Sequence, residues 1–151
     1  MKQWPVDLSP DALAQWVGNH FEDTLMGLLG MQVIEVSKTR AVIDLPIHAG
    51  LTTPSGHIHA GSMVSLADTS ATFAAMAVLQ RAVTLEEMPV AVNISSQIVG
   101  NVQEGTLRSE STVVHPGRTL VAVTTRITAD NSKLLALAVS YTHLRAHETL
   151  R

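Results

Sequence analysis

The sequence predicts an α+β fold in which an antiparallel sheet wraps around one long central helix. An apolar stretch runs from about Ala60 to Arg81, and its length and its content of Ala, Met and Leu favour a helix over a strand. Two strand-like segments precede this stretch and four follow it. Short turns join consecutive segments, which implies antiparallel pairing. The 151 residues suit one domain with a real core.

The first predicted element is an amphipathic helix that begins at Pro10. Ser9 is a suitable N-cap, proline fits the first helical position, and Asp11 favours the positive end of the helix. One apolar face is predicted by four residues at helical spacing, Leu13, Trp16, Val17 and Phe21. The segment 27–30 contains two glycines and interrupts this pattern.

The strands are predicted from runs of β-branched residues. Two of them, at 31–39 and 40–47, are joined by a polar turn near 37–39. The segment LTTPSGH, at 51–57, is a loop by its content of Thr, Pro, Ser and Gly. After the central helix, strands are predicted at 90–99, 106–115, 118–129 and 133–142, and the turns between them contain Gly or Asn.

The composition excludes several classes of function. Only 15% of the residues are charged, against about a quarter in a typical soluble domain, which suggests that a subunit interface hides part of the surface. The net charge is −3 and no basic run is present, which argues against a nucleic-acid partner. The absence of cysteine excludes disulfides and thiol catalysis. No apolar run is long enough to span a bilayer and no signal peptide is visible, so we expect a cytoplasmic protein without a membrane partner.

The last residues, SYTHLRAHETLR, differ from the rest of the chain. They lack strand alternation and a turn signal, and they are similar to a vector-derived read-through. We therefore predict one domain over residues 1–140 and set residues 141–151 apart as a C-terminal tail that need not be native.

Asp68 is the residue that most needs an explanation. It is the only formally charged side chain between Gly56 and Gln80, in a helix that is apolar on nearly every face. An unpaired buried carboxylate costs several kcal/mol, so it persists where it is paired, exposed in a cleft or useful. It could face solvent at a gap in the sheet or cap a backbone turn. The functional alternative is a catalytic carboxylate, with Thr72 one turn further on the same helical face.

The start of the helix offers a partner for such chemistry. The amides near Ala60, Gly61 and Ser62 have no intrahelical acceptor, and they form a positive pole suited to a carbonyl oxygen that becomes negative. Asp68 lies roughly 10 Å beyond Gly61 along the helix axis, too far to act on a carbonyl bound there. An antiparallel copy of the helix in a second subunit would supply the carboxylate. The sequence therefore predicts a homodimer, or a dimer of dimers, whose active sites straddle the interface.

The segment TTPSGHIHAGSMVSLADTSATFAA resembles the signature of hotdog-fold acyl-CoA thioesterases of the phenylacetate-pathway type. The pattern has a Gly, then a His followed by Gly residues, then a helix that reads Leu-Ala-Asp/Glu-Thr. It is matched at eight positions, Pro54, Gly56, His59, Gly61, Leu66, Ala67, Asp68 and Thr69. Weaker similarity covers about residues 28–139. The resemblance implies a hotdog fold, in agreement with the order of elements predicted above.

The resemblance also implies a role for individual residues. Asp68 becomes the nucleophile or the general base that activates water, and the Ala60 amide becomes the donor that polarises the thioester carbonyl. His59 orients the loop and the substrate, and Thr72 occupies a position that is often Ser or Thr. The substrate is an aryl- or fatty acyl-CoA, and no cofactor is needed.

The chain departs from the family pattern at two positions. Thr53 stands where Asn or Gln is usual, and Ala60 replaces the first Gly after the motif His. A left-handed backbone at Ala60 would cost roughly 1 kcal/mol. The other candidate substrate-binding residues are Gly56 in the loop and five residues to which the resemblance gives a role. These are Asn93 and Ser96 on a strand, and His115, Gly117 and Arg118 in a turn that could contact a CoA phosphate. Asn93 and Ser96 could equally be ordinary polar residues of a strand, and an ordinary hairpin is the simpler interpretation of the turn.

Two alternative functions stay open, and a metal site is not expected. No HExxH-type spacing exists among the seven histidines, so we predict no metal site. A non-catalytic acyl-CoA-binding module is the first alternative function, because of the changes at Thr53 and Ala60. A dehydratase or hydratase of the same fold is the second, since His59 and Asp68 could supply its His and its carboxylate.

Overall fold

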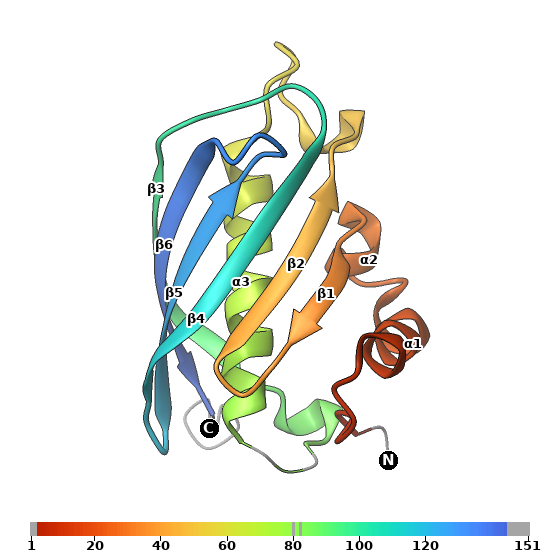
Figure 1. The fold of residues 1–151 in the computed structure, drawn as a ribbon, viewed down its shortest axis with the longest axis vertical. Coiled ribbons are helices and arrows are strands. Elements are labelled where there is room, and N and C mark those ends of the chain that lie inside the picture. The colour runs from red at the N-terminus through yellow and green to blue at the C-terminus, as the bar shows by residue number, and fades with distance from the viewer. Residues whose placement is uncertain (1–2, 80, 82, 145–151) are drawn as a thin grey trace.

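A computed structural model describes residues 3–79, 81 and 83–144 of the chain. A six-stranded antiparallel sheet curves around one long helix, α3 (Ala60–Val78), as the sequence predicts (Figure 1). The strands are β1 (Gln32–Val36), β2 (Arg40–Pro46), β3 (Val90–Ile98), β4 (Thr106–Pro116), β5 (Leu120–Thr128) and β6 (Leu134–His143). Their order in the sheet is β1-β2-β4-β5-β6-β3, so β1 and β3 form its two edges. This is the hotdog architecture, and the predicted fold class is confirmed.

Helix α1 (Pro10–Phe21) begins where the sequence predicts it and packs beside β1. Ser9 is its N-cap residue, but the Ser9 side chain makes no capping hydrogen bond. A second helix, α2 (Leu25–Leu29), occupies the segment that the glycines were expected to interrupt. Gly30 ends α2 in the left-handed conformation, with φ of +81°, which glycine adopts without a steric cost.

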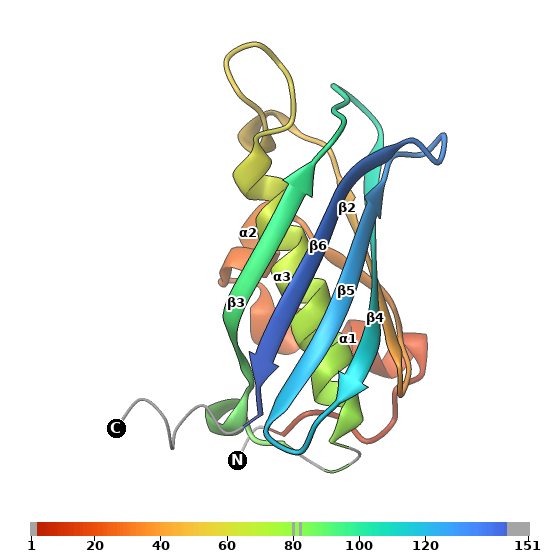
Figure 2. The ribbon, with the colours of Figure 1, turned by 90° about the vertical axis from the view of Figure 1, so that its left-hand side faces the viewer.

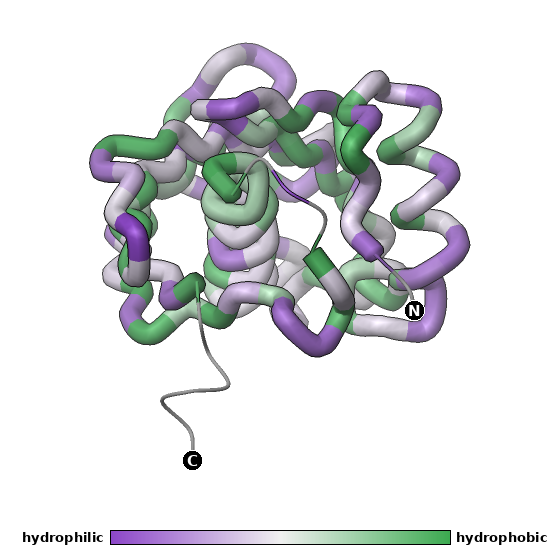
Figure 3. Tube along the Cα trace, turned by 90° about the horizontal axis from the view of Figure 1, so that it is seen from below, coloured by the Kyte–Doolittle hydropathy of each residue, from purple (hydrophilic) through white to green (hydrophobic). Residues whose placement is uncertain are grey.

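The interface between α3 and the sheet is built from small side chains. The buried residues of α3 include Ala67, Ala71, Ala74, Ala75 and Ala77. The buried polar residues of β4, β5 and β6 are all Ser or Thr, namely Ser109, Ser111, Thr125, Ser140 and Thr142. Small residues on both surfaces let the helix lie close to the sheet. Viewed from below, α3 runs through the middle of the molecule, between the strands and α1 (Figure 3).

Two boundaries differ from the prediction. Helix α3 ends at Val78, before the predicted limit at Arg81. Strand β6 continues to His143, past the predicted domain boundary at 140, and Leu144 after it is buried. The pairing of β6 with both β3 and β5 holds these residues in the sheet. The rest of the predicted tail, 145–151, lies outside the described residues. Among the described helices, none has the length and apolar character needed to cross a membrane.

Candidate active site

A pocket of about 220 Å³ lies beside the middle of α3 and contains Asp68. Its other lining residues are Phe21, Thr24, Leu25, Met26, Thr69, Thr72, Phe73 and Met88. Asp68 is the only charged residue among them, and most of the others are apolar or aromatic. The structure therefore brings the predicted carboxylate and the predicted Thr72 to one cleft.

Asp68 has no partner among the residues that the structure describes. It makes no hydrogen bond or ion pair to any described residue, and its Oδ1 atom is buried. Burial raises the pKa of the Asp68 carboxyl above its ordinary value of 3.8. The structure shows no turn capped by Asp68 within the described residues, and the half-buried side chain lines a largely apolar pocket. A base with a raised pKa can accept a proton at a pH closer to neutrality.

The raised pKa makes a prediction about stability. The folded state binds the Asp68 proton more tightly than the unfolded chain does. The contribution of this group to stability is therefore complete below pH 3.8, and it is lost as the pH rises through the raised pKa of the folded state. Asp68→Asn cannot ionise. We expect its free energy of unfolding to increase relative to wild type across that interval and then to level off.

Urea unfolding at several pH values checks this expectation. Asp23→Asn, which changes an exposed carboxylate in the α1–α2 connection, is the matched control. A constant difference between Asp68→Asn and wild type at all pH values would contradict the prediction.

Thr72 and Thr69 contribute differently to the pocket. The Thr69 hydroxyl donates to the Ser65 carbonyl at 2.8 Å and is thereby engaged within the helix. No hydrogen bond joins Thr72 to Asp68 within the described residues, although both line the same pocket. Thr72 is placed to hold a water or a substrate atom beside the carboxylate.

The start of α3 provides one backbone donor. His59 is the N-cap residue, its Nδ1 atom accepts the Gly61 amide at 2.9 Å, and its carbonyl accepts the Ser62 amide at 2.9 Å. The structure therefore differs from the expectation at Gly61 and Ser62, whose amides are already engaged. The Ala60 amide has no acceptor among the described residues and remains the candidate oxyanion donor.

The backbone conformation of Ala60 removes the free-energy cost that a left-handed backbone would have there. Ala60 is the first residue of α3, and it is not among the described residues with a positive φ. A glycine is not required there, and Ala60 keeps its N–H without backbone strain. His59 accepts through Nδ1, which places the proton of a neutral ring on Nε2.

The loop before α3 is held by an asparagine from another part of the chain. Asn101, in the β3–β4 connection, accepts the Ile58 amide through Oδ1 and donates to the Ile58 carbonyl through Nδ2, both at 2.9 Å. Its carbonyl accepts the Lys133 ammonium at 2.8 Å. The His59 amide donates to the Leu51 carbonyl at 2.9 Å. These bonds fix the backbone that leads into the Ala60 amide, and the sequence alone did not reveal Asn101.

Two of the predicted substrate-binding residues shape that loop. The Thr53 hydroxyl contacts the Ser55 hydroxyl at 2.9 Å and donates to the His57 carbonyl at 3.2 Å. Thr53 therefore stabilises the turn and does not point a free side chain to Asp68. Gly56 has φ of +80°, a conformation that requires glycine in this turn.

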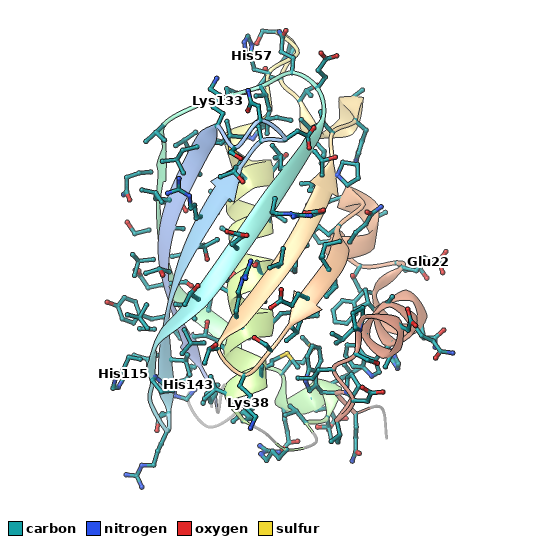
Figure 4. The ribbon with its side chains drawn as sticks, in the orientation of Figure 1. Glu22, Lys38, His57, His115, Lys133 and His143 are labelled. Carbon is teal, nitrogen blue, oxygen red and sulfur yellow. The ribbon has the colours of Figure 1, made fainter. Side chains whose placement is uncertain are left out.

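The other predicted substrate-binding residues do not converge in one protomer. Asn93 pairs with the exposed Tyr141 on the outer face of the sheet, whereas Ser96 pairs with the buried Ala138 on the inner face. His115 lies at the opposite end of the molecule from His57 (Figure 4). Gly117 and Arg118 follow His115 in the β4–β5 turn, far from the loop that precedes α3.

The sequence also missed one wall of the pocket. Phe21, Thr24, Leu25 and Met26 come from the end of α1 and from α2, and they lie over Asp68. No local pattern assigns these residues to the carboxylate, because only the packing of α1 and α2 beside α3 brings them there. Within the described residues, no three His, Asp or Glu side chains gather into a set that could hold a metal ion.

The model of one protein family, the thioesterase superfamily, matches residues 55–136, which include the end of the loop, α3 and the strands β3, β4 and β5. The chain belongs to the thioesterase superfamily. This membership confirms the predicted class of enzyme, a thioester hydrolase.

Relatives and solved structures agree with this membership. The 1,4-dihydroxy-2-naphthoyl-CoA hydrolase of Listeria monocytogenes is 25% identical over 116 residues, which are 75% of this chain and 91% of that protein. A Haemophilus influenzae thioesterase has a similar fold, with a TM-score of 0.78 and 18% identity over 91% of this chain and 90% of that one. The Escherichia coli PaaI protein of the phenylacetic acid degradation operon gives a TM-score of 0.76 at 22% identity, over 91% of this chain and 96% of that one.

Proposed function

We propose that this thioesterase-superfamily chain is an acyl-CoA thioesterase of the phenylacetate-pathway type, and that it hydrolyses an aryl- or fatty acyl-CoA to the free acid and CoA. The observation that carries the proposal is the unpaired Asp68 carboxylate in an apolar pocket. Thioester hydrolysis needs an attacking oxygen and a donor for the developing oxyanion, and Asp68 and the Ala60 amide supply the two. The acyl group occupies the apolar part of the pocket.

The proposed reaction proceeds in two steps. Asp68 provides the attacking oxygen, either from its own carboxylate or from a water that it deprotonates, and a carbon–oxygen bond forms at the thioester carbonyl. The negative oxygen that results accepts a hydrogen bond from the Ala60 amide. The carbon–sulfur bond then breaks. When Asp68 has deprotonated a water, it passes that proton to the CoA sulfur as the sulfur leaves. When Asp68 attacks directly, the CoA sulfur leaves as a thiolate and takes its proton from the water that hydrolyses the anhydride. That hydrolysis restores the carboxylate.

The proposal includes a dimer with shared sites. Asp68 lies eight residues beyond Ala60 on one continuous helix, about 12 Å away along its axis, so the two groups of one chain cannot act on one carbonyl. Strand β3 forms one edge of the sheet (Figure 2). It carries exposed apolar residues, Val90, Val92 and Ile98. A twofold axis that pairs two β3 strands in antiparallel fashion would run the two α3 helices in opposite directions.

A panel of thioesters tests the proposed function. The assay follows CoA thiol release from aryl-, short-chain and long-chain acyl-CoAs, with enoyl- and 3-hydroxyacyl-CoAs included for product analysis. We expect free acid and CoA as the products. Binding of acyl-CoA without turnover would instead favour a binding module, and interconversion of enoyl- and 3-hydroxyacyl-CoA would favour a hydratase.

A further inference from the structure

Two pockets follow one another along α3 and are separated by aromatic rings. The Asp68 pocket, of about 220 Å³, is lined at one end by Phe73. A second pocket, of about 190 Å³, lies one helical turn further along α3, where it contacts Met76 and Ala77. Its other lining residues are Trp4, Pro5, Val6, Leu8, Lys38 and Arg81. Apolar side chains make up most of this second lining.

A pair of rings in contact joins the linings of the two pockets. The Phe73 and Trp4 rings meet edge to face, with their centroids 5.1 Å apart and an interplanar angle of 73°. Phe73 lines the first pocket and Trp4 lines the second. We call this pair the aromatic floor. Only 1% of Phe73 and 4% of Trp4 is exposed, so neither ring has room to move aside freely.

Neighbouring rings hold the aromatic floor in place. Trp4 contacts Trp16 at a centroid distance of 5.1 Å, and Phe73 contacts Phe21 at 6.0 Å. The Trp16 indole N–H donates to the Gln3 carbonyl at 2.6 Å, which ties α1 to the N-terminal segment that carries Trp4. The floor is therefore supported from α1, from α3 and from the N-terminal segment.

We propose that the aromatic floor limits the length of the acyl group, and that Phe73 is its specificity-determining residue. This inference rests on the proposed function. A dry cavity of about 150 Å³ accommodates benzene, so the Asp68 pocket takes a single ring or a chain of about six to eight carbons. A longer chain that enters beside Asp68 meets Phe73. Its continuation would need the space of the second pocket, which the floor closes off.

The inference predicts a change of chain-length preference when the floor is opened. We expect wild-type kcat/KM to fall beyond about eight carbons in a series from butanoyl- to tetradecanoyl-CoA. Phe73→Leu removes the ring and joins the two pockets. Its kcat/KM for decanoyl- and dodecanoyl-CoA, relative to hexanoyl-CoA, should rise at least about tenfold. Phe73→Leu combined with Ala77→Met, which fills the second pocket, should reverse that gain.

Two further variants make the test specific. Leu28→Ala removes an exposed apolar side chain of α2 that lines neither pocket, and it should leave the chain-length limit in place. Trp4→Leu removes the second ring of the floor and should lengthen the preferred acyl chain. This variant provides the test if thermal unfolding shows that Phe73→Leu is not folded. The inference is overturned if folded Phe73→Leu and Trp4→Leu keep the wild-type profile while short acyl-CoAs are hydrolysed. If wild type hydrolyses no acyl-CoA at all, the proposed function fails and the inference fails with it.

Discussion

Asp68→Asn is expected to lower kcat for thioester hydrolysis by about 10³- to 10⁴-fold, with little change in KM. The amide has nearly the shape of the carboxylate, but it neither accepts a proton nor attacks a carbonyl. A positioned general base contributes about 10²- to 10⁴-fold, and the apolar lining around Asp68 contains no second carboxylate to replace it. The pocket that binds the acyl group stays intact, so substrate binding should persist.

CoA thiol release under saturating substrate measures this loss. Asp23→Asn, at an exposed site before α2, is the matched control and should retain wild-type kcat. In wild type, the acid limb of the kcat/KM profile should lie above the ordinary aspartate pKa of 3.8, because burial raises the pKa of Asp68. Equal rates for Asp68→Asn and wild type would remove Asp68 from the mechanism.

Ala60→Pro is expected to lower kcat by about 10²- to 10³-fold without a comparable loss of stability. Proline lacks the N–H that we propose as the oxyanion donor. It is also well suited to the first position of a helix, which Ala60 occupies, and the preceding His59 has the extended backbone that a proline favours before it, with φ of −66° and ψ of 132°. The substitution thus removes one hydrogen-bond donor, and the backbone at this position can accommodate proline.

Steady-state kinetics and thermal unfolding together check this second expectation. Ala60→Gly retains the N–H and is the matched control, so its kcat should stay close to wild type. A folded Ala60→Pro protein with full activity would show that another group stabilises the oxyanion.

The same two variants reveal whether two chains share each site. If Asp68 and Ala60 of one site come from different subunits, a mixed dimer of Asp68→Asn and Ala60→Pro has one site with both defects and one intact site. Co-refolding the two inactive proteins in equal amounts should restore about a quarter of wild-type activity, because half of the dimers are mixed. No recovery in verified mixed dimers would place both groups of a site in one chain.

The sequence was most informative where local chemistry decides the structure. The Ala-rich stretch predicted α3, and Pro10 marked the first residue of α1, because propensities and helix ends depend on nearby residues. Asp68 was conspicuous because a lone charge in an apolar helix is costly. The strands were predictable from β-branched runs, although β6 extends beyond the predicted boundary.

The sequence was least informative where distant segments meet. Residues 21–26 cover Asp68 only because α1 and α2 pack beside α3, and spacing along the chain does not encode that contact. The ring of His59 engages the Gly61 amide, a local choice of rotamer that no pattern predicts. His115 and Arg118 looked compatible with the same substrate as Gly56, but the long β4 strand carries their turn to the other end of the protomer.

The position of Asp68 separates two requirements of an enzyme, a fixed reactive group and an adaptable surface for the substrate. The carboxylate stands on a helix whose opposite side is locked against the sheet by alanines and small hydroxyls, so its location tolerates little variation. About half of the surface that a substrate tail would touch comes from residues 21–26, at the end of α1 and in α2. Mutations there can retune which acids are released while the reactive group and its scaffold stay unchanged, an arrangement that favours rapid diversification of substrates within one architecture.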